Sequence, residues 1–108
     1  MNELDKLRKM LDDAKIPYES YQKIWDDMPP YNTDGEVGKY ARNQVKYGVY
    51  DRQGILDGIC QWGSYGAEEG LIETYGPLGV DENGEPMVMT AQEVFDIIKA
   101  DWEKENKQ

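Results

Sequence analysis

A glycine-rich stretch from residue 63 to residue 70, GSYGAEEG, carries the most suggestive chemistry in the sequence. Such a stretch resembles a backbone cradle for an anion. It lacks the Gly-Lys-Ser/Thr ending of a P-loop and the spacing of a dinucleotide-binding loop. Glu68 and Glu69 would oppose a phosphate, so glycines that supply tight turns are the favoured interpretation. If a ligand does bind here, the hydroxyls of Ser64 and Tyr65 are its expected polar contacts.

Other catalytic and metal-binding patterns are missing or weak. The sequence has no histidine, which removes the commonest general base and the commonest neutral metal ligand. Its one cysteine, Cys60, stands in a predicted strand with no cation beside it, which favours a buried core thiol over a reactive one. Residues 81–85, DENGE, resemble the start of a calcium loop, but the glycine comes too early, which favours a hairpin turn. Glu69 and Glu73 would share a face only on a helix, and solvated glutamates are far commoner than catalytic pairs. We therefore expect no enzymatic activity, no cofactor and no bound metal.

The aromatic residues are the more informative feature. Eight tyrosines and three tryptophans are more than a core of this size can hide. Both residue types are enriched at interfaces, because each offers rigid apolar area with a polar tip. Tyr31 and Tyr40, in or beside a proline-containing loop, and Tyr65 are the candidates for exposed contacts. The candidate ligand- or partner-binding residues are thus Ser64, Tyr65, Gly66, Tyr31, Tyr40, Glu68 and Glu69.

Two amphipathic helices frame the chain. Leucines and an alanine recur at helical spacing over residues 2–15, with Asn2 as the cap and a proline at position 17 as the stop. At the other end, Thr90 and Glu93 form a capping box, and an apolar stripe follows over residues 90–104.

Between the helices the pattern predicts short strands. Residues 18–25, 43–50 and 55–62 read as strands, the last two joined by a turn at residues 51–54. Residues 71–75 fit a strand or one helical turn, and strand is preferred. Residues 83–84 are a turn signal before a short apolar piece at 87–89. The sequence predicts a single α+β domain over residues 1–108 in α-β-β-β-α order. An N-terminal helix and a C-terminal helix pack on an antiparallel sheet of three to four strands.

Charge and hydropathy limit the partners and the cellular compartment that we expect for this protein. Residues 51–89 hold eight acidic residues and one basic residue, net -7, within a total net charge of -10. Such a segment repels nucleic acid, whose binding needs cations against phosphate. Solubility is the favoured role of the charge, and attraction of a basic partner is the alternative. No apolar run approaches the length of a membrane span, and residues 1–13 lack the apolar centre of a signal peptide. We therefore expect cytoplasmic residence without direct nucleic-acid or membrane binding.

Two stretches also carry a resemblance. NQVKYGVYDRQGILDGICQWGSYGAEEGLIETYG and MTAQEVFDIIKADWEK resemble a group of short acidic proteins encoded by phages, prophages and conjugative elements of gut Firmicutes. Members open with a helix like NELDKLRKMLDDAKIP. They share the Asn-Gln strand, the Ile-Cys strand, the Ser-Tyr-Gly loop and the Thr-Ala-x-Glu-Val-Phe helix start. The group has no established activity, so the resemblance implies a setting only: an accessory protein of a mobile element in a bacterial host cytoplasm.

Three functions follow as hypotheses. The leading one is a non-enzymatic protein that binds a host protein, such as a defence protein that it inhibits, through an acidic, tyrosine-rich surface. The second is a small-ligand binder, such as a sponge for a signalling nucleotide, that uses the loop at residues 64–66. The third is a structural or assembly protein of the element.

Overall fold

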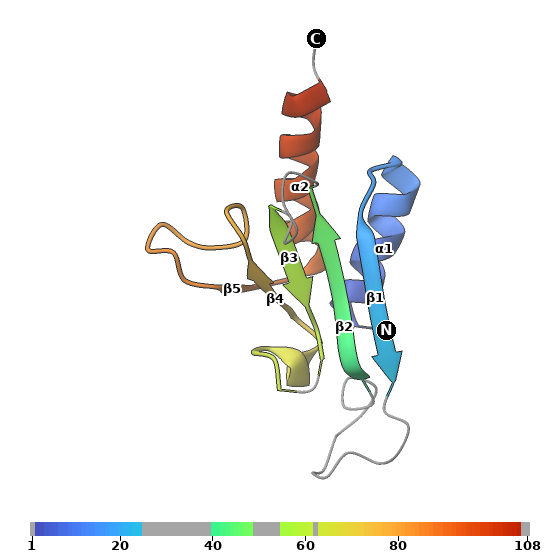
Figure 1. The fold of residues 1–108 in the computed structure, drawn as a ribbon, viewed down its shortest axis with the longest axis vertical. Helices are drawn as coiled ribbons and strands as arrows, with labels where there is room; N and C mark the ends of the chain where they lie inside the picture. Colours follow the sequence, from blue (N-terminus) through green and yellow to red (C-terminus); the bar gives the residue numbers. More distant parts are fainter. Residues whose placement is uncertain (1, 25–39, 49–54, 62, 107–108) are drawn as a thin grey trace.

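The fold is given by a computed structural model that describes residues 2–24, 40–48, 55–61 and 63–106. In chain order the elements are α1 (Glu3–Ala14), β1 (Glu19–Ile24), β2 (Tyr40–Tyr47), β3 (Leu56–Ile59), the short 3-10 helix η2 (Ala67–Glu69), β4 (Ile72–Tyr75), β5 (Met87–Met89) and α2 (Ala91–Asn106) (Figure 1). This order confirms the predicted α+β class: the strands of an antiparallel sheet follow one helix in the sequence and precede the other.

The sheet has five strands in the order β1-β2-β3-β4-β5, and every neighbouring pair is antiparallel. The sequence predicts three or four strands. The extra one is β5, whose three residues are too few to display an alternating pattern but pair fully with β4. Residues 71–75 contain β4, which confirms the strand interpretation of this stretch. The predicted turn at residues 51–54 lies outside the described residues.

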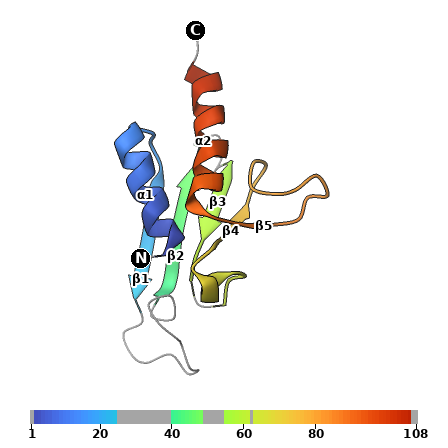
Figure 2. The same ribbon diagram turned by 180° about the vertical axis from the view of Figure 1, so that it is seen from behind.

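Both helices cover the same face of the sheet, which stands in front of them in Figure 1 and behind them in Figure 2. The core lies between these two layers. Its buried apolar residues are Leu4, Leu7, Leu11, Ile16, Val45, Tyr47, Leu56, Cys60, Ile72, Met89, Ala91, Val94 and Ile98. Each fully buried large aliphatic side chain contributes about 1.5–3 kcal/mol relative to its exposed state. On the opposite face of the sheet, no helix of the described chain covers the strands, and we call it the open face.

Helix α1 begins as predicted, since the Asn2 side chain accepts a hydrogen bond from the backbone of Asp5 at 2.9 Å. It ends at Lys15, whose φ of 60° is left-handed and whose N–H turns back to the last carbonyls of the helix. Ala14, predicted to continue the leucine stripe, is exposed instead because the helix stops there.

Helix α2 begins with the predicted capping box. The backbone of Thr90 donates to the Glu93 carboxylate at 3.0 Å, and the backbone of Glu93 donates to the Thr90 hydroxyl at 3.3 Å. The carboxylate of Glu3, in the first turn of α1, accepts a second α2 amide, that of Ala91, at 2.8 Å. Two residues 88 positions apart thus join the starts of the two helices. Neither helix of the described chain combines the length and apolar content needed to cross a bilayer.

Arg8 fixes α1 to the first two strands. Its guanidinium donates to the Asn43 side chain at 2.7 Å, to the Ser20 hydroxyl at 2.8 Å and to Asp5 at 3.1 Å. Asn43 is fully buried on β2, and its amide donates in turn to the carbonyl of Cys60, which directly follows β3, at 3.0 Å. One charged side chain therefore satisfies a polar group inside the core, which would otherwise cost free energy.

Candidate functional site

The open face is built by alternate residues of paired strands, since residues opposite one another in a sheet share a face. Glu73 of β4 lies opposite Ile59 of β3 and Val88 of β5, and Tyr75 lies opposite Asp57. The intervening residues of β4, Ile72 and Thr74, face the helices and are fully buried. The alternation of the stretch LIETY therefore places Glu73 and Tyr75 on the side away from the core.

Glu73 is only 3% exposed, although it lies on the open face. One carboxylate oxygen accepts a hydrogen bond from the backbone N–H of Tyr65 at 2.7 Å, and the other accepts one from the Tyr75 hydroxyl. Because no described helix covers this face, the shielding comes from neighbouring side chains and from the loop that carries Tyr65. Glu73 thus holds this loop and the Tyr75 ring in fixed positions.

Exposed apolar area gathers around this carboxylate. Four large hydrophobic side chains of the described chain are exposed: Tyr65 at 76%, Ile24 at 53%, Val88 at 42% and Tyr75 at 37%. Three of them, Tyr65, Tyr75 and Val88, surround Glu73, and we call these three the aromatic patch. A cluster of exposed apolar residues with a polar rim is typical of an interaction site, whereas single exposed residues are not.

The hydrogen bond to Glu73 raises the pKa of Tyr75 to about 12, and burial adds to the effect. A phenolate beside a carboxylate would be repelled, so the ring keeps its proton throughout the neutral range. Tyr75 therefore acts as a hydrogen-bond donor with a fixed ring, and it is poorly suited to exchange protons with a substrate.

The loop predicted to cradle an anion is held by its own chain. The Ser64 hydroxyl accepts from the backbone of Gln61 at 3.0 Å and donates to the Gln61 carbonyl at 2.8 Å. The amides of Ser64, Tyr65, Ala67, Glu69, Gly70 and Leu71 all donate to protein acceptors. An anion cradle needs successive N–H groups left free for the ligand. The loop therefore matches the turn interpretation.

Gly66 illustrates why glycine is needed there. Its φ is +80°, and a Cβ built at this position would come within 2.4 Å of the side chain of Val88. The glycine thus lets the loop lie against β5, which brings Tyr65 beside Val88. Glu68 and Glu69 follow on η2 and are both exposed.

The prediction that Tyr40 is an exposed contact is wrong. It was placed among the exposed contacts because it borders the proline-containing loop, but it is 7% exposed. A bulge between Lys23 and Ile24 shifts the β1–β2 register at this point and sets Tyr40 opposite Ile24. Strand β2 begins at Tyr40, earlier than predicted, and the Tyr40 side chain is buried. Tyr31 lies outside the described residues.

Cys60 confirms the core interpretation. Its side chain is fully buried, and burial raises its pKa to about 11. The calcium-loop look-alike is a turn, because the Asp81 carboxylate accepts the backbone N–H groups of Asn83 and Glu85 at 2.8 and 3.0 Å. Across the described ranges, no group of three or more His, Cys, Asp or Glu side chains is placed to hold a metal ion.

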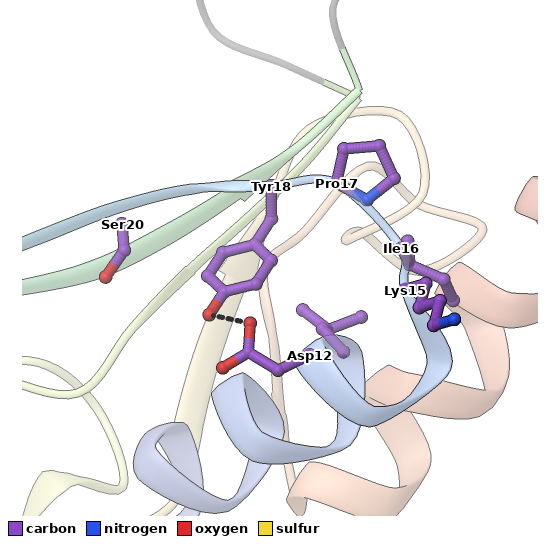
Figure 3. A pocket seen from close by; sticks show the side chains of 7 residues that line it. Asp12, Lys15, Ile16, Pro17, Tyr18 and Ser20 are labelled. Carbon is purple, nitrogen blue, oxygen red and sulfur yellow. Dashed lines mark hydrogen bonds between the residues drawn. The ribbon is translucent and has the colours of Figure 1, made fainter.

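A shallow groove of about 510 Å³ lies elsewhere, between the end of α1 and the start of β1. Figure 3 shows the Tyr18 hydroxyl pointing to Asp12, to which it donates at 2.8 Å. Burial, followed by this bond, raises the pKa of Tyr18. The Tyr18 hydroxyl and the Asp12 carboxylate are thus paired with each other, and the exposed Lys15 adds a cation to the lining.

The comparisons with known proteins give no match: the chain matches no protein-family model, no curated protein and no solved structure. The link to proteins of mobile elements therefore stays a prediction.

The sequence reasoning found Tyr65 but missed its two partners. Tyr75 was one aromatic among many, and Glu73 was weighed only as half of a catalytic pair. The alternation of residues 71–75 was the available signal, since it sets these two side chains on one face. It could not show that a bond from the Tyr65 backbone takes the carboxylate out of water.

Proposed function

We propose that the protein is a non-enzymatic binding protein that recognises another protein through the aromatic patch on its open face. The observation that carries the proposal is the gathering of Tyr65, Tyr75 and Val88 around one buried carboxylate. The Tyr75 ring and the Tyr65 backbone are held in place before binding, so they lose little conformational freedom when a partner arrives, which favours affinity. Tyrosines are also among the residues that most often dominate binding energy.

The chemistry of the described residues favours binding over catalysis. The Ser64 hydroxyl is engaged in its own turn, the Cys60 thiol is buried, and the Tyr75 hydroxyl is bound to Glu73. A nucleotide sponge is less well supported, because the loop amides are engaged and carboxylates surround them. The setting proposed for this activity is the bacterial cytoplasm, in an accessory protein of a mobile element whose target is a host protein, such as a defence protein.

Affinity capture from bacterial lysate tests the proposal. Immobilised wild-type protein, Tyr65→Ala and Ile24→Ala are compared at low and moderate salt, with bound proteins quantified by mass spectrometry. Ile24 is the matched control, because it is an exposed hydrophobic residue outside the patch. We expect wild type and Ile24→Ala to retain the same protein and Tyr65→Ala to lose most of it. Capture of no protein, or equal capture by Tyr65→Ala, contradicts the proposal.

A further inference from the structure

On the open face, one tyrosine ring already contacts cations of its own chain. At the β1–β2 end, the guanidinium carbon of Arg42 lies 4.1 Å from the centre of the Tyr21 ring. The ammonium of Lys46 lies 5.5 Å from the same ring. Both cations are within the distance at which an aromatic face attracts positive charge. The tyrosine at this end of the face is thus already occupied by cations of its own chain.

The β3–β5 end has rings and negative charge but no cations. Residues 55–61 and 63–89 contain no lysine and no arginine, whereas they contain seven carboxylates. The seven are Asp57, Glu68, Glu69, Glu73, Asp81, Glu82 and Glu85. Two of them, Glu68 and Glu69, are exposed directly after Tyr65. Asp57 lies opposite Lys46 of β2, whereas Glu68 and Glu69 have no cation of their own segment beside them. Exposed carboxylates raise the local concentration of cationic groups, so these two favour positive charge supplied by another molecule.

We infer that the aromatic patch receives an arginine side chain from a basic segment of the partner protein. The guanidinium lies against the rings of Tyr65 and Tyr75, as Arg42 lies against Tyr21, and Glu68 and Glu69 attract the flanking positive charge. Arginine is favoured over lysine because its planar, weakly hydrated group stacks on aromatic faces. The inference rests on the proposed function and names the chemistry of the partner.

The segment belongs to a different protein and not to a second copy of this chain. Arg42, the arginine that the described strands place on the open face, is already engaged: its Nε and an Nη both donate to the Gln44 side chain, at 2.9 and 2.8 Å. Gln44 in turn donates to Asp57 at 2.6 Å. A second copy could offer Arg42 to the patch only by breaking this chain of bonds and leaving Tyr21.

Peptide binding tests the inference directly. The probe is a fluorescent peptide of alternating arginine and glycine, measured by anisotropy against the intact protein. A matched peptide carries citrulline, which keeps the shape of arginine without its charge, and a third carries lysine. We expect the arginine peptide to bind, the lysine peptide to bind more weakly and the citrulline peptide to lose binding. Binding should weaken as salt rises.

Variants locate the peptide on the surface. Tyr65→Ala should lower the affinity for the arginine peptide about fivefold or more, in line with the loss of one exposed cation–aromatic contact. Ile24→Ala should leave its affinity unchanged. Amide shifts of the wild type on titration should concentrate at residues 65, 75 and 88. The amide spectrum of each variant before peptide is added shows whether it is folded.

Three outcomes overturn the inference. Equal binding of the citrulline peptide shows that charge is not recognised. Equal binding by Tyr65→Ala shows that the peptide lies on carboxylates in general and not on the patch. Dimerisation of the free protein that Tyr65→Ala abolishes shows that a second copy occupies the face. If lysate capture depends on Tyr65 while the arginine peptide fails, the proposed function stands and this inference alone is lost.

Discussion

Tyr75 and Glu73 lie two residues apart on the open side of β4, and the tyrosine hydroxyl donates to the glutamate carboxylate. The same carboxylate accepts the backbone N–H of Tyr65, so one buried carboxylate fixes the Tyr75 hydroxyl and the backbone of Tyr65. The electrostatic consequence can be measured without knowing any partner.

Replacing Glu73 by glutamine should lower the pKa of Tyr75 from about 12 toward its ordinary value of 10.0, because a neutral amide does not repel the phenolate. Absorbance titration of wild type and Glu73→Gln gives the difference, and Tyr75→Phe identifies the residue. Unchanged titration curves for wild type and Glu73→Gln would contradict the assigned bond.

The same bond gives a direction for stability at high pH. Since the folded-state pKa of Tyr75 exceeds its unfolded value, its contribution is fully present below pH 10.0 and is lost as pH rises toward about 12. The free energy of unfolding should therefore fall over this range, and the fall should be smaller in Tyr75→Phe. Urea denaturation at several pH values measures both. If the free energy of unfolding falls equally with pH in wild type and Tyr75→Phe, Tyr75 does not cause the fall.

Two glycines of the patch loop form a matched pair. Gly66 and Gly63 both have positive φ, +80° and +87°, but only at Gly66 would a Cβ meet a neighbour, the side chain of Val88. Both alanine variants should lose about 1–2 kcal/mol from the left-handed backbone. Gly66→Ala should lose about 1–3 kcal/mol more from the clash. Urea denaturation compares them, and equal losses would show that the loop does not lie against β5 as described.

Arg8 should be difficult to replace even by lysine. A lysine has one ammonium in place of a planar fork, so it cannot serve Asn43, Ser20 and Asp5 together. Arg8→Lys should destabilise the protein by about 1–3 kcal/mol, because the buried Asn43 oxygen loses its short hydrogen bond. Lys9→Ala, at an exposed position of the same helix, is the control and should change stability by less than about 0.5 kcal/mol. Chemical denaturation that finds the two variants alike would show that this network contributes little.

Cys60 should react slowly with thiol reagents in the native protein. The side chain is fully buried and its pKa is raised to about 11, so little thiolate is present at neutral pH. Labelling with a chromogenic disulfide should become fast only when urea unfolds the chain. Rapid labelling of the folded protein would mean that the β3 end of the core opens readily.

Local pattern predicts the helices and their caps but not the polar anchors. The leucine spacing of α1 and the Thr90–Glu93 box depend on residues a few positions apart, so they can be read directly. Arg8 shows the limit of such predictions, because the sequence of α1 does not distinguish it from a solvent-exposed charged residue. Its partner Asn43 is 35 positions away and comes within reach only when the strands pair.

The candidate site follows the same rule. Tyr65 is predictable as an exposed residue because glycines surround it in a turn. The burial of Glu73 is not predictable, since a glutamate in a short strand normally faces water. Here the backbone N–H of Tyr65, on the preceding loop, binds the carboxylate and helps to shield it from water. The prediction for Tyr40 fails for a related reason, because its burial and the register shift beside it arise only when β2 pairs with β1.

The hydrogen bond between Glu3 and Ala91 also bears on how the protein is made. A nascent chain can fold α1 and pair its early strands while α2 is still being synthesised. The apolar face of α1 then stays exposed until α2 packs beside it, and the core is complete only when residues up to Ile98 have left the ribosome. Premature stops inside α2 should thus yield chains that expose their leucines to chaperones and proteases, even though every strand is already complete.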